Sequence, residues 1–255
     1  MAVTQRPTQT IPKPPERRLR LWRILLVCTL LCWLIPIRFS ILKLGMIGGS
    51  AAFWAWSLIA FWRWPWVRWT CLALGAFAVA AGVFLVLPGH SYDPAALRAR
   101  YVACLLSYRG TPYVYGGGSR LGIDCSGLVQ RGLIDAEFEQ AVTTYNPALA
   151  RMGLSLWWHN RSARALGAGY RGETERLFGA PSLNALAYKR VQPGDLAVMS
   201  DGVHVLAYVG NRTWIEADPT PMRVILAHAP RPLDAYFAQP VQIMRWRVLE
   251  ESQNH

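Results

Sequence analysis

The chain has 255 residues, which is enough for one ordinary domain plus an accessory segment. Hydrophobic residues make up 53% of it and the formal net charge is +12, but most of that charge lies in residues 1–90, whereas residues 91–255 are nearly balanced. The basic residues flank apolar runs and form no basic stripe interleaved with aromatic residues. This pattern argues against a nucleic-acid-binding protein and favours a membrane protein.

Three apolar runs occupy the first third of the chain, at residues 24–37, 44–62 and 69–92. The second and third runs carry no charge and are long enough to span a bilayer. The first run has only 14 residues and reaches spanning length only by including the residues just before it. We therefore predict a transmembrane region at residues 21–90 with three helices. Two helices are the alternative, with the first run lying in the membrane interface.

The segment before these runs is rich in proline and arginine. Residues 1–20 have no hydrophobic period, which predicts a disordered basic tail. Because positively charged flanks stay inside, the tail is expected in the cytoplasm of a multi-pass protein of the inner, or cell, membrane. Three crossings would then place residues 91–255 on the periplasmic or extracellular side, whereas two crossings would leave them in the cytoplasm.

The pattern changes to that of a soluble domain at Asp93. Asp93 and Pro94 match a helix N-cap followed by proline at the first helical position, and Gly110 is expected to end the helix. Between them, apolar residues recur with the period of an amphipathic helix, at Leu97, Tyr101, Cys104, Leu105 and Tyr108. On that face, Cys104 is expected to be a small buried hydrophobic residue.

The second half of the soluble domain is rich in predicted strands. Turn signals separate short apolar segments at residues 195–200, 203–209 and 212–217, and two more candidates follow at 224–227 and 241–246. Helices followed by a strand meander predict an α+β domain in which helices pack on an antiparallel sheet.

One cysteine lies in a chemically suggestive setting. A glycine-rich loop leads into Asp124, Cys125, Ser126 and Gly127, and an apolar run then continues as a plausible helix. At a helix N-terminus, unpaired backbone N–H groups and the helix dipole stabilise a thiolate, and the same groups can receive an oxyanion. Cys125 is therefore the candidate nucleophile.

A nucleophilic thiol needs a base and a group that orients it. Of the five histidines, His204 has the best setting, because it lies in a predicted strand soon after a Pro-Gly-Asp turn. In the next strand, Glu216 and Asp218 project to one face by the period-two rule. Glu216 is the candidate orienting residue, and Asp218 is held in reserve. No motif predicts a metal or an organic cofactor.

These residues together resemble the NlpC-type cell-wall cysteine peptidases, a bacterial family with a papain-like fold. The resemblance covers roughly residues 95–220, and the shared features are a tyrosine, a Gly-Gly pair, Asp-Cys-Ser-Gly, Pro-Gly-Asp, a strand histidine and a polar residue twelve positions later. They correspond here to Tyr113, Gly116–Gly117, Asp124–Gly127, Pro193–Asp195, His204 and Glu216.

The resemblance implies a thiol endopeptidase whose substrates are peptidoglycan stem peptides, often cut between D-glutamate and a diamino acid. By the same resemblance, Tyr113 would help to hold the oxyanion or the nucleophile. Asp124 and Ser126, which flank Cys125, are expected on the oxyanion and substrate-binding side. The expected partners are thus stem peptides and, through the N-terminal helices, membrane lipid.

The chain departs from the family pattern in two respects. The third catalytic position is commonly histidine in the family but is Glu216 here, and a carboxylate can also orient an imidazole. Residues 138–185 are extra to the compact pattern and are expected to be an insertion that serves as a lid, a substrate-specific wall or a membrane-touching loop.

Two other functions use the same sequence features. A papain-like acyltransferase or amidase acting on a lipid or other amide at the membrane would share the catalytic residues, and product identity would distinguish it. A non-catalytic membrane scaffold that binds glycan peptides is the third possibility. The Cys125 and His204 pair argues against it.

Overall fold

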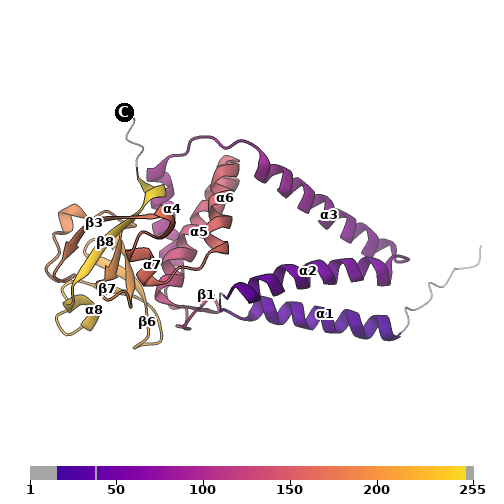
Figure 1. Ribbon diagram of the computed structural model, residues 1–255, viewed down its shortest axis with the longest axis horizontal. Coiled ribbons are helices and arrows are strands. Elements are labelled where there is room, and N and C mark those ends of the chain that lie inside the picture. Colours follow the sequence, from indigo (N-terminus) through magenta and orange to yellow (C-terminus); the bar gives the residue numbers. More distant parts are fainter. Residues whose placement is uncertain (1–15, 38, 251–255) are drawn as a thin grey trace, which may run out of the picture. The chain divides into compact units, whose positions relative to one another are not determined.

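The computed structural model describes residues 16–37 and 39–250, and these divide into two compact units (Figure 1). The first unit contains three helices from the first third of the chain. The second contains residues 85 onward together with the short segment Ile35–Ser40. The predicted tail at residues 1–15 lies outside the described residues.

The first unit consists of α1 (Glu16–Leu34), α2 (Ser40–Phe61) and α3 (Pro65–Val86). Among the described residues, two helices, α2 and α3, are long and apolar enough to cross a membrane. Helix α1 begins at Glu16, so the prediction of a disordered segment was wrong for residues 16–20. An acidic residue in the first turn and arginines with good helix propensity explain this start.

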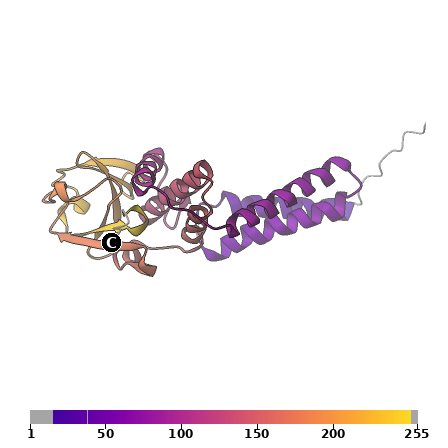
Figure 2. The same cartoon turned by 90° about the horizontal axis from the view of Figure 1, so that it is seen from above.

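The helices of the second unit are α4 (Pro94–Ser107), α5 (Cys125–Thr144), α6 (Pro147–Trp158), α7 (Ala163–Gly167) and α8 (Ala235–Ala238). Helices α4, α5 and α6 lie side by side (Figures 1 and 2). Helix α5 contacts both α4 and α6, and it also packs against the sheet. The predicted start of α4 is confirmed, because the Asp93 side chain accepts a hydrogen bond from the N–H of Ala95 at 2.8 Å.

The described part of this unit contains a six-stranded antiparallel sheet in the order β3-β8-β4-β5-β6-β7. Its strands are β3 (Thr174–Ala180), β4 (Leu196–Met199), β5 (Val205–Gly210), β6 (Thr213–Asp218), β7 (Arg223–His228) and β8 (Val241–Trp246). A small hairpin of β1 (Gly118–Ser119) and β2 (Gly122–Ile123) precedes α5. The α+β prediction, with helices packed on an antiparallel sheet, is confirmed.

The segment predicted as an insertion, residues 138–185, is built into the domain. Residues 138–144 continue α5, α6 packs back on α5, and β3 extends the sheet as an edge strand beside β8. Only a short stretch of it, residues 160–163, borders the cleft described below. Most of the segment thus belongs to helices and to a strand of the domain, and its role as a lid, a substrate-specific wall or a membrane-touching loop stays a prediction.

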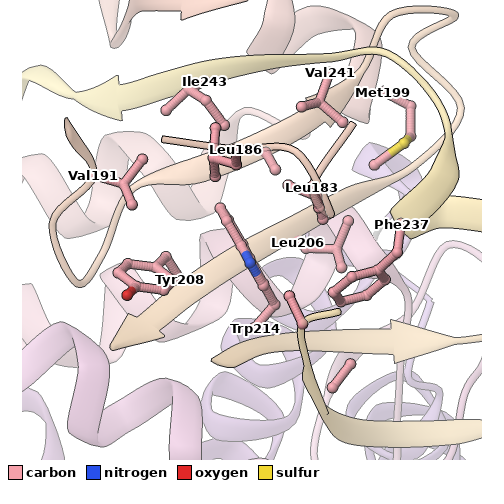
Figure 3. Close-up of a cluster of buried hydrophobic side chains, with 13 residues drawn as sticks. Leu183, Leu186, Val191, Met199, Leu206, Tyr208, Trp214, Phe237, Val241 and Ile243 are labelled. Carbon is pink, nitrogen blue, oxygen red and sulfur yellow. The ribbon is translucent and has the colours of Figure 1, made fainter. Parts of the chain in front are cut away.

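A cluster of buried apolar side chains fixes the strands that carry the candidate base and its partner (Figure 3). Trp214 lies at its centre, fully buried, and its indole N–H donates to the Tyr188 hydroxyl at 3.1 Å. Phe237 anchors α8 against the same cluster. Burying side chains of this size stabilises the fold by roughly 2–3 kcal/mol each, so β6 and α8 are held firmly in place.

Asp195, from the Pro-Gly-Asp turn, is a structural residue in this fold. It is fully buried, and its carboxylate forms a two-point ion pair with Arg245 of β8 at 2.7 and 2.8 Å. It also accepts a hydrogen bond from the N–H of Gln192. These contacts join the turn before β4 to the neighbouring strand.

Candidate active site

Cys125 is the first residue of α5, as the sequence predicted. Asp124 is the N-cap: its Oδ1 accepts hydrogen bonds from the Gly127 N–H at 2.5 Å and the Ser126 hydroxyl at 3.0 Å. The polar N-cap and the apolar face of α5, buried between α4, α6 and the sheet, together fix the point where the helix begins. The thiol therefore sits where the positive end of the helix dipole favours a negative charge.

The loop that precedes Cys125 is folded tightly on itself. The N–H of Gly116 donates to Asp124 Oδ2 at 2.9 Å, and the N–H of Gly117 donates to the Val114 carbonyl at 2.8 Å. A Cβ atom at Gly117 would lie 2.5 Å from the Gly122 carbonyl oxygen, so only glycine fits there. The Asp124 carboxylate thus holds the loop against the helix start, and because it is an acceptor it cannot donate to an oxyanion. Asp124 also borders the cleft described below, so its expected place on the substrate-binding side stays a prediction.

His204 lies just before β5, and Glu216 lies in the neighbouring strand β6. His204 Nε2 is 2.8 Å from Glu216 Oε2, and both side chains are buried. The second oxygen, Oε1, has no hydrogen-bond partner among the described residues. Asp218 bonds instead to the N–H of Thr220, so Glu216 and not the reserve residue contacts the imidazole.

The electrostatic setting of His204 favours its protonated form. Burial lowers the pKa of His204, but hydrogen bonding to Cys125 and to Glu216 and their negative charges outweigh burial and raise the pKa to about 10. Burial also raises the pKa of Glu216, while its bond to His204 lowers it. With Nε2 bonded to Glu216, the ring nitrogen left for the thiol is Nδ1. His204 is therefore hydrogen-bonded to Glu216, and Cys125 lies close enough to influence the pKa of the imidazole.

Tyr236 of α8 is a neighbour of the imidazole that the sequence did not reveal. Its ring stacks on His204 with the centroids 3.9 Å apart and the planes inclined by 12°. An aromatic face attracts a cation, so this contact both positions the imidazole and stabilises its charged form. Tyrosine in a four-residue helix gives no sequence signal for such a contact, because it depends on the long-range packing of α8.

Replacing Tyr236 with alanine is expected to move the alkaline change in the rate of Cys125 alkylation by iodoacetamide to lower pH by about 0.7, because a ring contact of about 1 kcal/mol supports the imidazolium form of His204. The measurement is the pH dependence of the alkylation rate, followed by mass spectrometry. Tyr236→Phe keeps the ring and should match the wild type. If the phenylalanine variant showed the same shift as the alanine variant, stacking would not be the cause.

Cys125 and His204 open into a cleft of about 530 Å³. The lining includes the aromatic side chains of Tyr113, Tyr115 and Tyr236, and also residues 160–163. Gln130 of α5 holds residues 160–163 in place, because its side-chain amide donates to the Arg161 carbonyl at 2.6 Å and to the Ser126 carbonyl at 3.0 Å. In the described part of the chain, no group of three His, Cys, Asp or Glu side chains could hold a metal ion.

Tyr113 and Ser126 both border the cleft, as expected, but they differ in what they offer. Burial and the nearby Cys125 charge raise the pKa of Tyr113 to about 12, so its hydroxyl stays a neutral hydrogen-bond donor at ordinary pH. The Ser126 hydroxyl donates to Asp124 and reinforces the N-cap. Of these two side chains, Tyr113 is therefore the better placed to meet a substrate.

Comparison with known proteins agrees with this geometry. The model of the NlpC/P60 family matches residues 110–239, about half of the chain. A stretch of 39 residues is 54% identical to Dipeptidyl-peptidase 6 of Lysinibacillus sphaericus, covering 15% of this chain and 14% of that protein.

Solved structures with detectable similarity are about 20% identical to this chain. NlpC2 from Trichomonas vaginalis is 20% identical with a TM-score of 0.39, over 64% of this chain and 50% of that one. The peptidoglycan hydrolase RipB from Mycobacterium tuberculosis is 20% identical with a TM-score of 0.39, over 62% of this chain and 67% of that one. The chain thus spans half the length of the first of these and a small part of the curated relative. On the match of the family model, the chain belongs to the NlpC/P60 family, whose members are cysteine peptidases and peptidoglycan hydrolases.

Proposed function

We propose that this chain is a membrane-anchored cysteine endopeptidase that hydrolyses amide bonds in peptidoglycan stem peptides. Cys125 would be the nucleophile, His204 the general acid and base, and Glu216 the residue that orients the imidazole. The observation that carries the proposal is the hydrogen bond between His204 and Glu216 beside an open cleft that Cys125, at a helix N-terminus, also lines.

In the proposed reaction, the Cys125 thiolate attacks the carbonyl carbon of the scissile amide. Negative charge moves to the carbonyl oxygen, which the backbone N–H groups at the start of α5 and the Tyr113 hydroxyl would stabilise. His204 then donates its proton to the departing amine, and a thioester remains on Cys125. Water, deprotonated by His204, attacks this thioester and restores the free thiol.

The state of His204 suits the first half of this cycle. With a pKa of about 10, it carries a proton at neutral pH and can pass it to the leaving amine. Glu216 fixes the imidazole through Nε2 and balances its charge. Asp124 takes no direct part in this scheme and acts by holding the glycine-rich loop and capping α5.

Membrane anchoring is proposed from the two apolar helices, α2 and α3. The segment before α2 and the segment after α3 belong to the same compact unit as the catalytic residues. Helix α2 would therefore cross the membrane away from the catalytic side, and α3 would cross back to it. Helix α1 would then be a third crossing, which places a basic N-terminus in the cytoplasm and the catalytic domain outside it. That location would give the enzyme access to peptidoglycan.

The test is to incubate the full chain, purified in detergent, with peptidoglycan fragments and to identify the products by mass spectrometry. We expect new stem-peptide fragments with the wild type and none with Cys125→Ala. The acyltransferase alternative would instead produce an acyl group transferred to lipid, so phospholipid should be included in one arm. Transfer to lipid, with stem peptides left intact, would overturn the peptidase proposal.

A further inference from the structure

A short segment between the first two helices belongs to the catalytic unit and not to the helices that it connects. Ile35–Ser40 groups with the residues from Leu85 onward. Ile37 forms an antiparallel bridge with Gly117, and the Gly118 N–H donates to the Pro36 carbonyl at 2.9 Å. The segment thus adds a strand-like edge to the glycine-rich loop that leads to Cys125.

Side-chain packing supports the backbone pairing. Ile37 Cγ2 lies 3.5 Å from the position of a Cβ atom on Gly116, and Pro36 Cβ lies 3.3 Å from the corresponding position on Gly122. A side chain at either glycine would therefore meet this segment, so the loop is covered closely along this side. The glycine-rich loop is therefore held from two directions, by Asp124 through Gly116 and by Pro36 through Gly118.

The segment also reaches the cleft itself. Phe39 borders the same cavity as Cys125 and His204, and 60% of its surface remains exposed. A large apolar side chain left open at the edge of a catalytic cleft is suited to contact a ligand, because apolar surfaces with a few placed polar groups are typical of binding sites. Phe39 does not belong to the sequence motifs that include Tyr113.

From these contacts we infer that Ile35–Ser40 is part of the active site. Pro36 and Ile37 position the glycine-rich loop before the nucleophile, and Phe39 provides an apolar wall that binds the peptide next to the scissile amide. The inference rests on the proposed function for the identity of the substrate. It means that residues 91–255 alone would lack one wall of the cleft and one support of the loop.

The first test asks whether the position of this segment affects the glycine-rich loop and catalysis. Two glycines inserted after Leu34 should displace the segment, whereas the same insertion after Arg63, in the turn between α2 and α3, leaves it unchanged. In the full chain, we expect the first insertion to speed hydrogen exchange at Gly116–Gly118 at least tenfold and to lower kcat/KM about tenfold. The second insertion should change neither. Equal effects, or no effect, of both insertions would overturn the positioning role.

The second test addresses Phe39. Phe39→Ala should raise KM for peptidoglycan fragments about fivefold with kcat nearly unchanged, and Phe39→Tyr should restore the wild-type value. Phe77→Ala, which removes a similarly exposed phenylalanine from α3, is the matched control. A fall in kcat with KM unchanged, or the same loss in the Phe77 variant, would overturn the substrate-contact role.

A readout without peptidoglycan distinguishes this inference from the proposed function. Iodoacetamide is small and reacts with Cys125 whatever the natural substrate. We expect Phe39→Ala to leave its rate unchanged and the insertion after Leu34 to reduce it about threefold. If the wild type failed to cut peptidoglycan, the proposed function would fall, while changed alkylation and exchange confined to the Leu34 insertion would still support the positioning role.

Discussion

Cys125→Ala is expected to lower kcat/KM for peptidoglycan fragments by at least about 10³-fold, to the limit of detection, while the protein stays folded. Loss of a nucleophile removes the covalent route entirely, and what remains comes from binding and the oxyanion donors alone. The substitution shortens a side chain at the surface of the cleft and leaves the N-cap contacts of Asp124 intact. Product release from fragments, followed by chromatography and mass spectrometry, measures the loss.

Cys104 provides the matched control for this variant. It lies buried in α4, and burial, followed by nearby acidic residues, raises the pKa of its thiol to about 12, so it should neither react nor contribute to catalysis. Cys104→Ala should keep wild-type kcat/KM and wild-type iodoacetamide labelling of the catalytic domain. If Cys125→Ala kept a tenth of the activity, or if Cys104→Ala abolished it, the assignment of the nucleophile would be wrong.

The sequence predicts those elements that carry strong local signals. Asp93 and Pro94 mark the start of α4, and turn signals around Gly202 and Gly210 delimit the strands of the meander. Strand β3 was missed because it is an edge strand with three of its seven residues exposed and only one buried, so it shows no clear alternation. It is stabilised by pairing with β8, which is distant in sequence, and local patterns do not record such pairing.

The residues of the candidate site also divide into those that local sequence signals indicate and those that depend on tertiary packing. Cys125 and Glu216 could be placed because a helix start and the period of a strand constrain where their side chains point, and His204 because it lies directly before a predicted strand's core. Tyr236 and the segment Ile35–Ser40 could not, because each reaches the site only through tertiary packing. The segment was also concealed by its position between two apolar runs, which led to its interpretation as part of a membrane region.

Glu216→Gln is expected to lower kcat by about 10²- to 10⁴-fold, because an amide can present its NH₂ group to His204 Nε2 and hold the imidazole in the wrong tautomer. Asp218→Asn is the matched control: it makes the same chemical change two residues along β6, on a side chain that bonds to Thr220. The control should keep activity within about threefold, a difference of less than 1 kcal/mol. Initial rates across a range of pH, for the three proteins, give both kcat and its pH dependence.

The pH dependence tests the electrostatic argument independently of the size of the loss. His204 must carry a proton for the amine to leave, so wild-type activity should fall as pH rises through about 10. Removing the Glu216 charge removes one of the effects that raise this pKa, so the alkaline fall should move to lower pH in Glu216→Gln and stay in place in Asp218→Asn. By linkage, the stability that charging His204 contributes is fully present below its unfolded pKa of about 6.5 and is lost as pH rises through the folded value. The melting temperature of the wild type should therefore decline over that interval more than that of Glu216→Gln. If the fall in activity at high pH did not move in Glu216→Gln, Glu216 would orient the imidazole without stabilising its positive charge.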